Sequence, residues 1–230
     1  MISVLREAVD DILRYCIQMI PCMAVAGIAF FLLRPLRMRR LNRLGWLSPW
    51  PRELALFVFI LFLAGLAGLT LFPSNLWSYV MQPNRYPEDV TFWSFYPTYP
   101  QIMERIDQLP QELPRIMTPF PYGLEWHFAS YWFAFLFFGN ICMFIPVGFF
   151  SALPWRKAHW WKSLCVGFFL SFFIEFVQFF INRGTDLDDL ILNTLGALVG
   201  YWIYWLLRVL CPKQVSRFHC QSREGEVYHG

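Results

Sequence analysis

The sequence predicts an all-α, polytopic membrane protein with five transmembrane helices in a single domain, 1–230. Its composition is the first reason: 57% of the residues are hydrophobic and only 15% are charged, unlike a soluble domain. The second reason is that the hydrophobic residues form long runs of about twenty residues, the length that crosses a hydrocarbon core about 30 Å thick. We expect spans at 12–33, 54–72, 128–153, 160–181 and 190–210.

The basic residues are distributed unevenly between the loops. They gather in the first loop, in the third loop and after the last span, whereas 73–127 and 182–189 are rich in acidic residues. Positively charged loops remain in the cytoplasm, so we expect the N-terminus outside and the C-terminus in the cytoplasm. Short arginine runs beside a membrane span are the ordinary signal for this, and no nucleic-acid partner is expected. The basic residues are Arg34, Arg37, Arg39, Arg40, Arg43, Arg52, Arg156, Lys157, Lys162, Arg208, Lys213, Arg217 and Arg223.

The segment 73–127, between the second and third spans, is rich in proline and aromatic residues. It holds nine of the 16 prolines, which prevent another span, and its aromatic side chains suit the lipid headgroup region. We expect an extracytoplasmic, interfacial segment with one short amphipathic helix at 101–109. Such a long connection is either a simple cap or a lid that contacts a lipid-linked ligand.

Small residues mark the faces where helices are expected to approach closely. In the second span, Gly65 and Gly68 lie among alanines and would admit a neighbouring helix. We expect the fourth and fifth spans to pack on each other through Gly167 and Ser171 on one and the pair Gly196 and Gly200 on the other.

Polar residues follow helical spacing in the fourth and fifth spans. Ser171, Glu175, Gln178 and Asn182 form one stripe, and Asp186, Asp189, Asn193, Gly196 and Gly200 form another. A helical hairpin that faces these stripes toward each other would enclose a polar pocket near one membrane surface. Asn140, an amide in the middle of the third span, either links helices or forms the floor of this pocket. His127, where the third span begins, is a further candidate ligand-binding residue. The expected ligand-binding residues are therefore His127, Asn140, Glu175, Gln178, Arg183, Asp186, Asp189 and Asn193.

Glu175 is the candidate catalytic residue. A charged carboxylate about two turns below the membrane surface costs several kcal/mol unless it is protonated or paired, and Arg183 is its nearest basic partner. No metal or cofactor is expected, although oxygen ligands at Glu175, Asp186 and Asp189 would suit Mg²⁺ or Ca²⁺. The sequence contains no HExxH, GxSxG or CxxC motif, which removes support for zinc hydrolases and serine hydrolases.

The order of these motifs resembles the VanZ-like family of bacterial membrane proteins over about 70–207. The residues that carry the resemblance are Asn140, Pro146, Gly148, Glu175, Gln178, Arg183, Asp186, Asp189, Asn193, Gly196 and Gly200. The resemblance implies a bacterial cell membrane location and low-level resistance to teicoplanin and related lipoglycopeptide antibiotics, by a mechanism distinct from altering the peptidoglycan terminus. It implies no particular chemistry, so it supplies motif positions and no catalytic roles.

Three function classes follow from these observations. The first is a non-enzymatic membrane protein whose outer pocket binds membrane lipid, a lipid-linked envelope precursor or a lipoglycopeptide. The second is an enzyme, a hydrolase or transferase, acting on a lipid-linked substrate, with Glu175 as general acid or base and Arg183 holding a phosphate. The third is a proton-coupled transporter, which the absence of internal repeats disfavours. Because no nucleophile has a recognisable base, binding is favoured over catalysis. The sequence does not set the oligomeric state.

Overall fold

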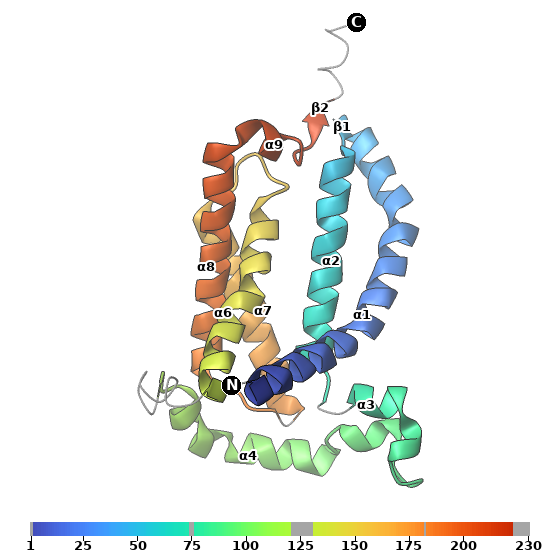
Figure 1. The fold of residues 1–230 in the computed structure, drawn as a ribbon, viewed down its shortest axis with the longest axis vertical. Helices are drawn as coiled ribbons and strands as arrows, with labels where there is room; N and C mark the ends of the chain where they lie inside the picture. The colour runs from blue at the N-terminus through green and yellow to red at the C-terminus, as the bar shows by residue number, and fades with distance from the viewer. Residues whose placement is uncertain (1, 74–75, 121–130, 182, 223–230) are drawn as a thin grey trace, which may run out of the picture.

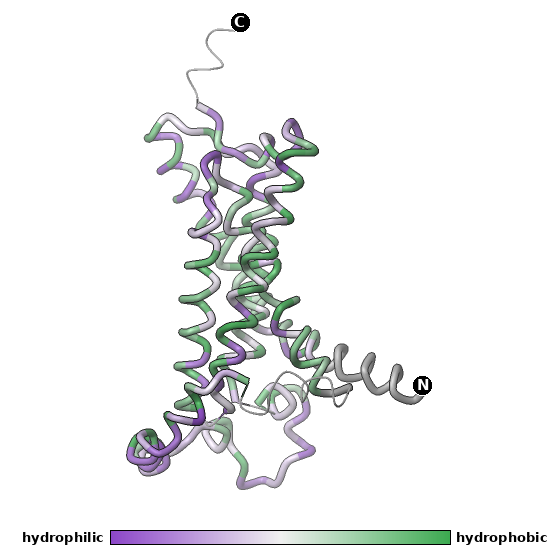
Figure 2. Tube along the Cα trace, turned by 90° about the vertical axis from the view of Figure 1, so that its left-hand side faces the viewer, coloured by the Kyte–Doolittle hydropathy of each residue, from purple (hydrophilic) through white to green (hydrophobic). Residues whose placement is uncertain are grey.

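The computed structural model describes residues 2–73, 76–120, 131–181 and 183–222, which are mostly helical. Five helices are long and apolar enough to cross a membrane, and they confirm the five predicted spans of a multi-pass membrane protein. Hydrophobic residues occupy the middle of the bundle and hydrophilic residues gather at its two ends (Figure 2). The five helices are α1 (Ile2–Arg43), α2 (Trp50–Thr70), α6 (Tyr131–Ala152), α7 (Trp160–Phe180) and α8 (Leu187–Leu210).

The helix α1 is longer than the span predicted for it. Its first turns lie across one end of the bundle, and the helix then bends and runs beside α2 (Figure 1). It continues through Pro35 to Arg43, where a loop was expected, because arginines in a last turn complement the negative end of the helix dipole. Gly45, in the left-handed region at φ 74°, follows this end.

A buried carboxylate joins α1 to α2. Glu53 is only 6% exposed and accepts hydrogen bonds from the Arg37 guanidinium and the Ser48 hydroxyl. The Nε atom of Arg34 lies 3.6 Å from the same carboxylate. A buried charge is costly without partners, so these contacts fix the first turn of α2 against the last turns of α1.

The helices α6, α7 and α8 pack closely, and the small residues of α8 decide how. A Cβ added at Gly196 would lie 2.2 Å from the carbonyl oxygen of Ile141, and one at Gly200 would lie 2.0 Å from that of Ile145. Both carbonyls belong to α6, so the expectation that Gly196 and Gly200 face α7 was wrong. Gly167 of α7 does face α8, because its added Cβ would lie 2.3 Å from the Cβ of Ala197.

The connecting segment lies across one end of the bundle, and the short pieces near the C-terminus lie at the other end (Figure 1). The predicted helix at 101–109 is confirmed as part of a longer one, α4 (Tyr99–Ile116). Before it come α3 (Leu76–Met81) and two 3₁₀ turns, η1 (Pro83–Arg85) and η2 (Phe92–Phe95). At the opposite end, α9 (Pro212–Ser216) follows α8, and β1 (Trp46–Leu47) pairs antiparallel with β2 (Gln221–Ser222).

Candidate functional site

Two of the predicted site residues hold the end of α2. The Nη1 atom of Arg183 donates to the carbonyl oxygens of Leu69 (2.6 Å) and Phe72 (3.0 Å). The Nε2 atom of Gln178, a buried residue of α7, donates to the carbonyl of Thr70 (3.2 Å). The last carbonyls of a helix have no partner within the helix, and a cation near them is favourable. Arg183 and Gln178 therefore cap α2 and fix it to the hairpin of α7 and α8.

Glu175 is buried under the turn that connects α7 to α8. Its side chain is 7% exposed, and its Oε2 atom accepts a hydrogen bond from the backbone N–H of Asp186 at 3.2 Å. Across the described ranges, no ion pair joins Glu175 to Arg183. The expected pair does not form because the Arg183 guanidinium is turned to the carbonyls at the end of α2.

The acidic residues at the start of α8 contact three different partners. Asp186 pairs with Arg115 of α4 at 3.1 Å, Asp188 accepts the backbone N–H of Phe120 at 2.6 Å, and Asp189 accepts a hydrogen bond from Asn140 of α6. Burial raises the pKa of Asp186; Arg115 opposes this effect and Asp188 adds to it. The described side chains contain no group of three or more His, Cys, Asp or Glu that could hold a metal ion.

Asn193 links α7 to α8 inside the bundle. It is 5% exposed, and its Nδ2 atom donates to the hydroxyl of Ser171, a completely buried residue, at 2.9 Å. Its Oδ1 atom is buried and has no hydrogen-bond partner among the described residues. Ser171 and Asn193 thus face each other as the two polar stripes predicted, but they meet in packed protein.

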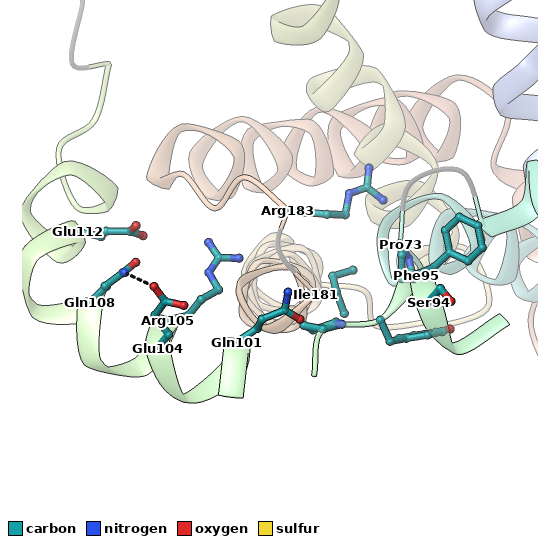
Figure 3. A pocket seen from close by; sticks show the side chains of 12 residues that line it. Pro73, Ser94, Phe95, Gln101, Glu104, Arg105, Gln108, Glu112, Ile181 and Arg183 are labelled. Atoms are coloured by element: carbon teal, nitrogen blue, oxygen red, sulfur yellow. Dashed lines mark hydrogen bonds between the residues drawn. The ribbon is translucent and has the colours of Figure 1, made fainter. Parts of the chain in front are cut away.

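A cavity of about 550 Å³ lies between α4 and the turn after α7. Arg105 and Arg183 reach it from different elements, the first from α4 and the second from the α7 to α8 turn (Figure 3). Arg183 is the predicted site residue that lines this cavity; His127 and Asn182 lie outside the described residues. The cavity is lined by Pro73, Ser94, Phe95, Tyr96, Pro97, Gln101, Glu104, Arg105, Gln108, Glu112, Ile181 and Arg183.

The charges of this cavity are two guanidinium groups and two carboxylates. The guanidinium of Arg105 lies 5.2 Å from the centre of the Phe179 ring, and its buried Nη1 atom has no hydrogen-bond partner in the described structure. Burial lowers the pKa of Arg183. The positive charge of this residue favours its contact with the carbonyl end of α2. Glu104 accepts a hydrogen bond from Gln108 at 3.2 Å. The cavity is therefore lined by cationic and acidic side chains together.

Sequence reasoning missed the α4 side of this site. Gln101, Glu104, Arg105, Gln108 and Glu112 all line the cavity and follow the spacing of one helix face. That polar periodicity was visible in the sequence. The interpretation of 101–109 as an interfacial amphipathic helix gave its polar residues no place in the site, whereas several of them line the cavity.

Comparison with known proteins identifies the family. The family model described as VanZ/LLP1 matches residues 57–208, which is more than half of the chain. The chain therefore belongs to this family, as the motif order predicted, and the match begins earlier than the predicted 70. No curated protein and no solved structure matched the chain. The matched region includes every residue that lines the cavity, and it excludes α1 and Glu53.

Proposed function

We propose that this VanZ-family membrane protein binds the polar headgroup of a lipid-linked or amphiphilic envelope component in the cavity beneath α4. We further propose that binding contributes to resistance to teicoplanin and related lipoglycopeptides, the role that the family name implies. One observation carries the binding proposal: the guanidinium-bearing residues Arg105 and Arg183 line the same cavity of about 550 Å³. The Nη1 atom of Arg105 has no hydrogen-bond partner among the described residues. Such a volume is within the range of small-molecule sites, and a buried guanidinium donor gains most from an anion.

The charges favour a ligand that carries both an anionic and a cationic group. Arg105 and Arg183 suit a phosphate or carboxylate, because a guanidinium matches such groups with two parallel donors. Glu104 and Glu112 suit an amine on the same headgroup. An apolar tail attached to that headgroup would remain in the adjoining lipid. The tail of a lipoglycopeptide is the feature that distinguishes it from vancomycin at such a site.

The orientation of the chain is part of the proposal. The last turns of α1 and the connection from α6 to α7, which contain basic runs, lie at the end of the bundle opposite α4 (Figure 1). Basic connections remain in the cytoplasm. The cavity would then open on the extracytoplasmic side, with the N-terminus outside and the C-terminus inside.

Binding is favoured over catalysis by the position of Glu175. This candidate acid or base is buried and does not line the cavity, where a general acid or base would have to reach its substrate. The charged groups that do line the cavity can hold a headgroup without reacting with it.

The resistance role is tested by expressing the chain in a susceptible Gram-positive host. Tolerance to teicoplanin should rise more than tolerance to vancomycin, and Arg105→Gln should remove the increase. The matched control is Arg85→Gln, which removes an exposed arginine of the same connecting segment that does not line the cavity. Immunoblots of membranes establish equal abundance. An equal response to both antibiotics, or a full response from Arg105→Gln, would refute the proposal.

The orientation is tested by thiol labelling in intact cells. In a chain whose native cysteines are replaced by serine, Gln101→Cys should react with an impermeant maleimide and Lys213→Cys should not. Both positions are exposed, so access differs only through the side of the membrane. The opposite labelling pattern would place the cavity in the cytoplasm.

A further inference from the structure

A second cavity, of about 570 Å³, lies at the other end of the bundle, where α6 ends and α7 begins. Ser151, Ala152, Ser163 and Val166 line its helical walls, and the connecting loop supplies the remainder. The Ser151 hydroxyl donates to the carbonyl of Gly148 at 2.9 Å and lies 3.0 Å from the Ser163 hydroxyl. The polar groups of the wall therefore satisfy one another, and the wall is otherwise apolar.

The charged groups that line this cavity all have one sign. Arg156, Lys157 and Lys162 line it together with His159, and no acidic residue is among the lining residues. None of the three cations belongs to an ion pair within the described ranges. All three are exposed, so their charges stand at the mouth of the cavity rather than in its apolar wall. The positive end of the α7 helix dipole adds to the same field.

A neighbouring histidine reports the same positive potential. Burial lowers the pKa of His219, and the charges of Arg156 and Arg208 lower it further. Its Nε2 atom is buried without a hydrogen-bond partner among the described residues. Arg156 of the third loop and Arg208 of α8 thus both lie near His219, and neither belongs to an ion pair within the described ranges.

The surrounding residues place this cavity at the level of the lipid headgroups. The span in α6 ends beside the cavity at Ala152, and the span in α7 begins beside it at Trp160. Trp155, Trp160 and Trp161 are each more than half exposed, as tryptophans are at a membrane interface. A ligand here would have lipid on one side and water on the other.

We infer that this cavity binds an anionic phospholipid of the leaflet at the basic end of the bundle. The phosphate would contact Arg156, Lys157 and Lys162, and an acyl chain would run along Val166 and the exposed apolar face of α7. Basic pockets between transmembrane helices suit such headgroups. A soluble phosphate fits less well, because it would leave the apolar wall exposed to water. The site is independent of the cavity beneath α4.

The test uses the full chain reconstituted in nanodiscs of phosphatidylcholine containing a minor fraction of phosphatidylglycerol. Native mass spectrometry of the released protein measures how much of each lipid remains bound. The wild-type chain should retain phosphatidylglycerol selectively. Arg156→Gln with Lys157→Gln should reduce that selectivity about tenfold or more, since each basic residue near an anionic headgroup contributes appreciably.

A matched control separates a built site from general attraction between charges. Lys213→Gln with Arg217→Gln removes the same two charge types from exposed positions at the same end, outside the cavity, and should retain the wild-type selectivity. Val166→Trp keeps every charge but fills the space beside the apolar wall of the cavity, so this variant should also lose its selective binding of phosphatidylglycerol. Melting curves in phosphatidylcholine alone verify that each variant is folded.

Three outcomes would overturn the inference. Equal loss in the control and in the cavity variant would show attraction to the basic end alone. Full retention in Val166→Trp would show that the cavity is not used. Displacement of the lipid by soluble glycerol phosphate at similar concentration would identify a free phosphate as the ligand.

Discussion

Replacing Gly200 by alanine should separate α6 from α8, because the two backbones touch at this glycine. The added Cβ would lie 2.0 Å from the carbonyl oxygen of Ile145 and 2.8 Å from the backbone nitrogen of Phe149. Ordinary contact begins at 3.4 Å, so the Cβ lies 1.4 Å too close to the oxygen. Both obstacles are backbone atoms of α6, which cannot rotate away as a side chain can.

The size of the effect follows from two opposing terms. Overpacking costs about 1 to 3 kcal/mol, and a clash with backbone belongs at the upper end of this range. Alanine recovers about 1 kcal/mol through its better helix propensity. Gly200→Ala should therefore lower the free energy of unfolding by about 2 kcal/mol. Gly139→Ala is the control: its Cβ meets nothing within 4 Å, so it should raise that free energy by about 0.5 to 1 kcal/mol.

The assay is unfolding in mixed micelles with increasing sodium dodecyl sulfate, followed by tryptophan fluorescence. Gly196→Ala should resemble Gly200→Ala, since its Cβ would lie 2.2 Å from the carbonyl oxygen of Ile141. The double variant should cost less than the two single losses together, because one displacement of α6 relieves both clashes. If Gly200→Ala were as stable as Gly139→Ala, the close approach of α6 and α8 would be refuted.

Three further predictions concern the polar residues, each measured in the same micelles or host. Arg183→Lys should lower the free energy of unfolding by about 1 to 2 kcal/mol, because the lysine nitrogen lies one bond short of the Nη1 atom that donates to both carbonyls. Arg115→Gln, which breaks a half-exposed pair, should cost less than about 1 kcal/mol, and equal losses would exclude the cap. The pKa of His219 in the folded protein lies below its ordinary value of 6.5, so the unfolded chain takes up a proton at this residue more readily than the folded protein. This difference has no effect on stability above about pH 6.5, and its destabilising effect is complete once the pH is below the pKa in the folded protein. The melting temperature should therefore fall as the pH is lowered from 7 to 5, and fall less in His219→Gln; identical pH curves would count against this. Glu175→Gln keeps a side-chain oxygen that can accept the hydrogen bond from the Asp186 N–H. The abundance of the protein and its teicoplanin tolerance should therefore both persist. Normal abundance without tolerance would favour the enzyme alternative.

The membrane fold was predictable because hydrophobicity and length decide it. The five spans needed only runs of apolar residues, and Gly65 and Gly68 predicted that some helix approaches α2 closely; the structure shows that this helix is α1. Partner choice was not predictable in the same way. Gly196 and Gly200 form a small-residue face that any helix can approach, and the three-dimensional arrangement of α6, α7 and α8 turns that face to α6.

The sequence identified polar residues of the helices, but of the predicted ligand-binding residues Arg183 is the one that lines the cavity, and the partners of the others were not predictable. The sequence predicted Asn140, Asp189 and Asn193 as residues of a polar pocket; in the structure Asn140 donates to Asp189, and Asn193 donates to Ser171. A buried polar side chain can be satisfied by any suitable partner, however. Every residue has a backbone carbonyl, so the sequence does not indicate which carbonyls will accept a hydrogen bond from a side chain. The expected pair of Glu175 and Arg183 considered side chains alone, whereas the end of α2 supplied the acceptors that the guanidinium uses.

Arg183 therefore has two roles that must be separated before any phenotype is assigned to it. Its Nη1 atom holds the end of α2, and its side chain also lines the cavity beneath α4. An anion bound there would reach the remaining donors of the guanidinium without displacing the cap, because Nη1 alone makes both capping bonds. Loss of Arg183 would thus disturb fold and binding together. Arg105 makes no capping bond and contacts the fold through the Phe179 ring, so its substitution reports on binding where the abundance of the variant is unchanged.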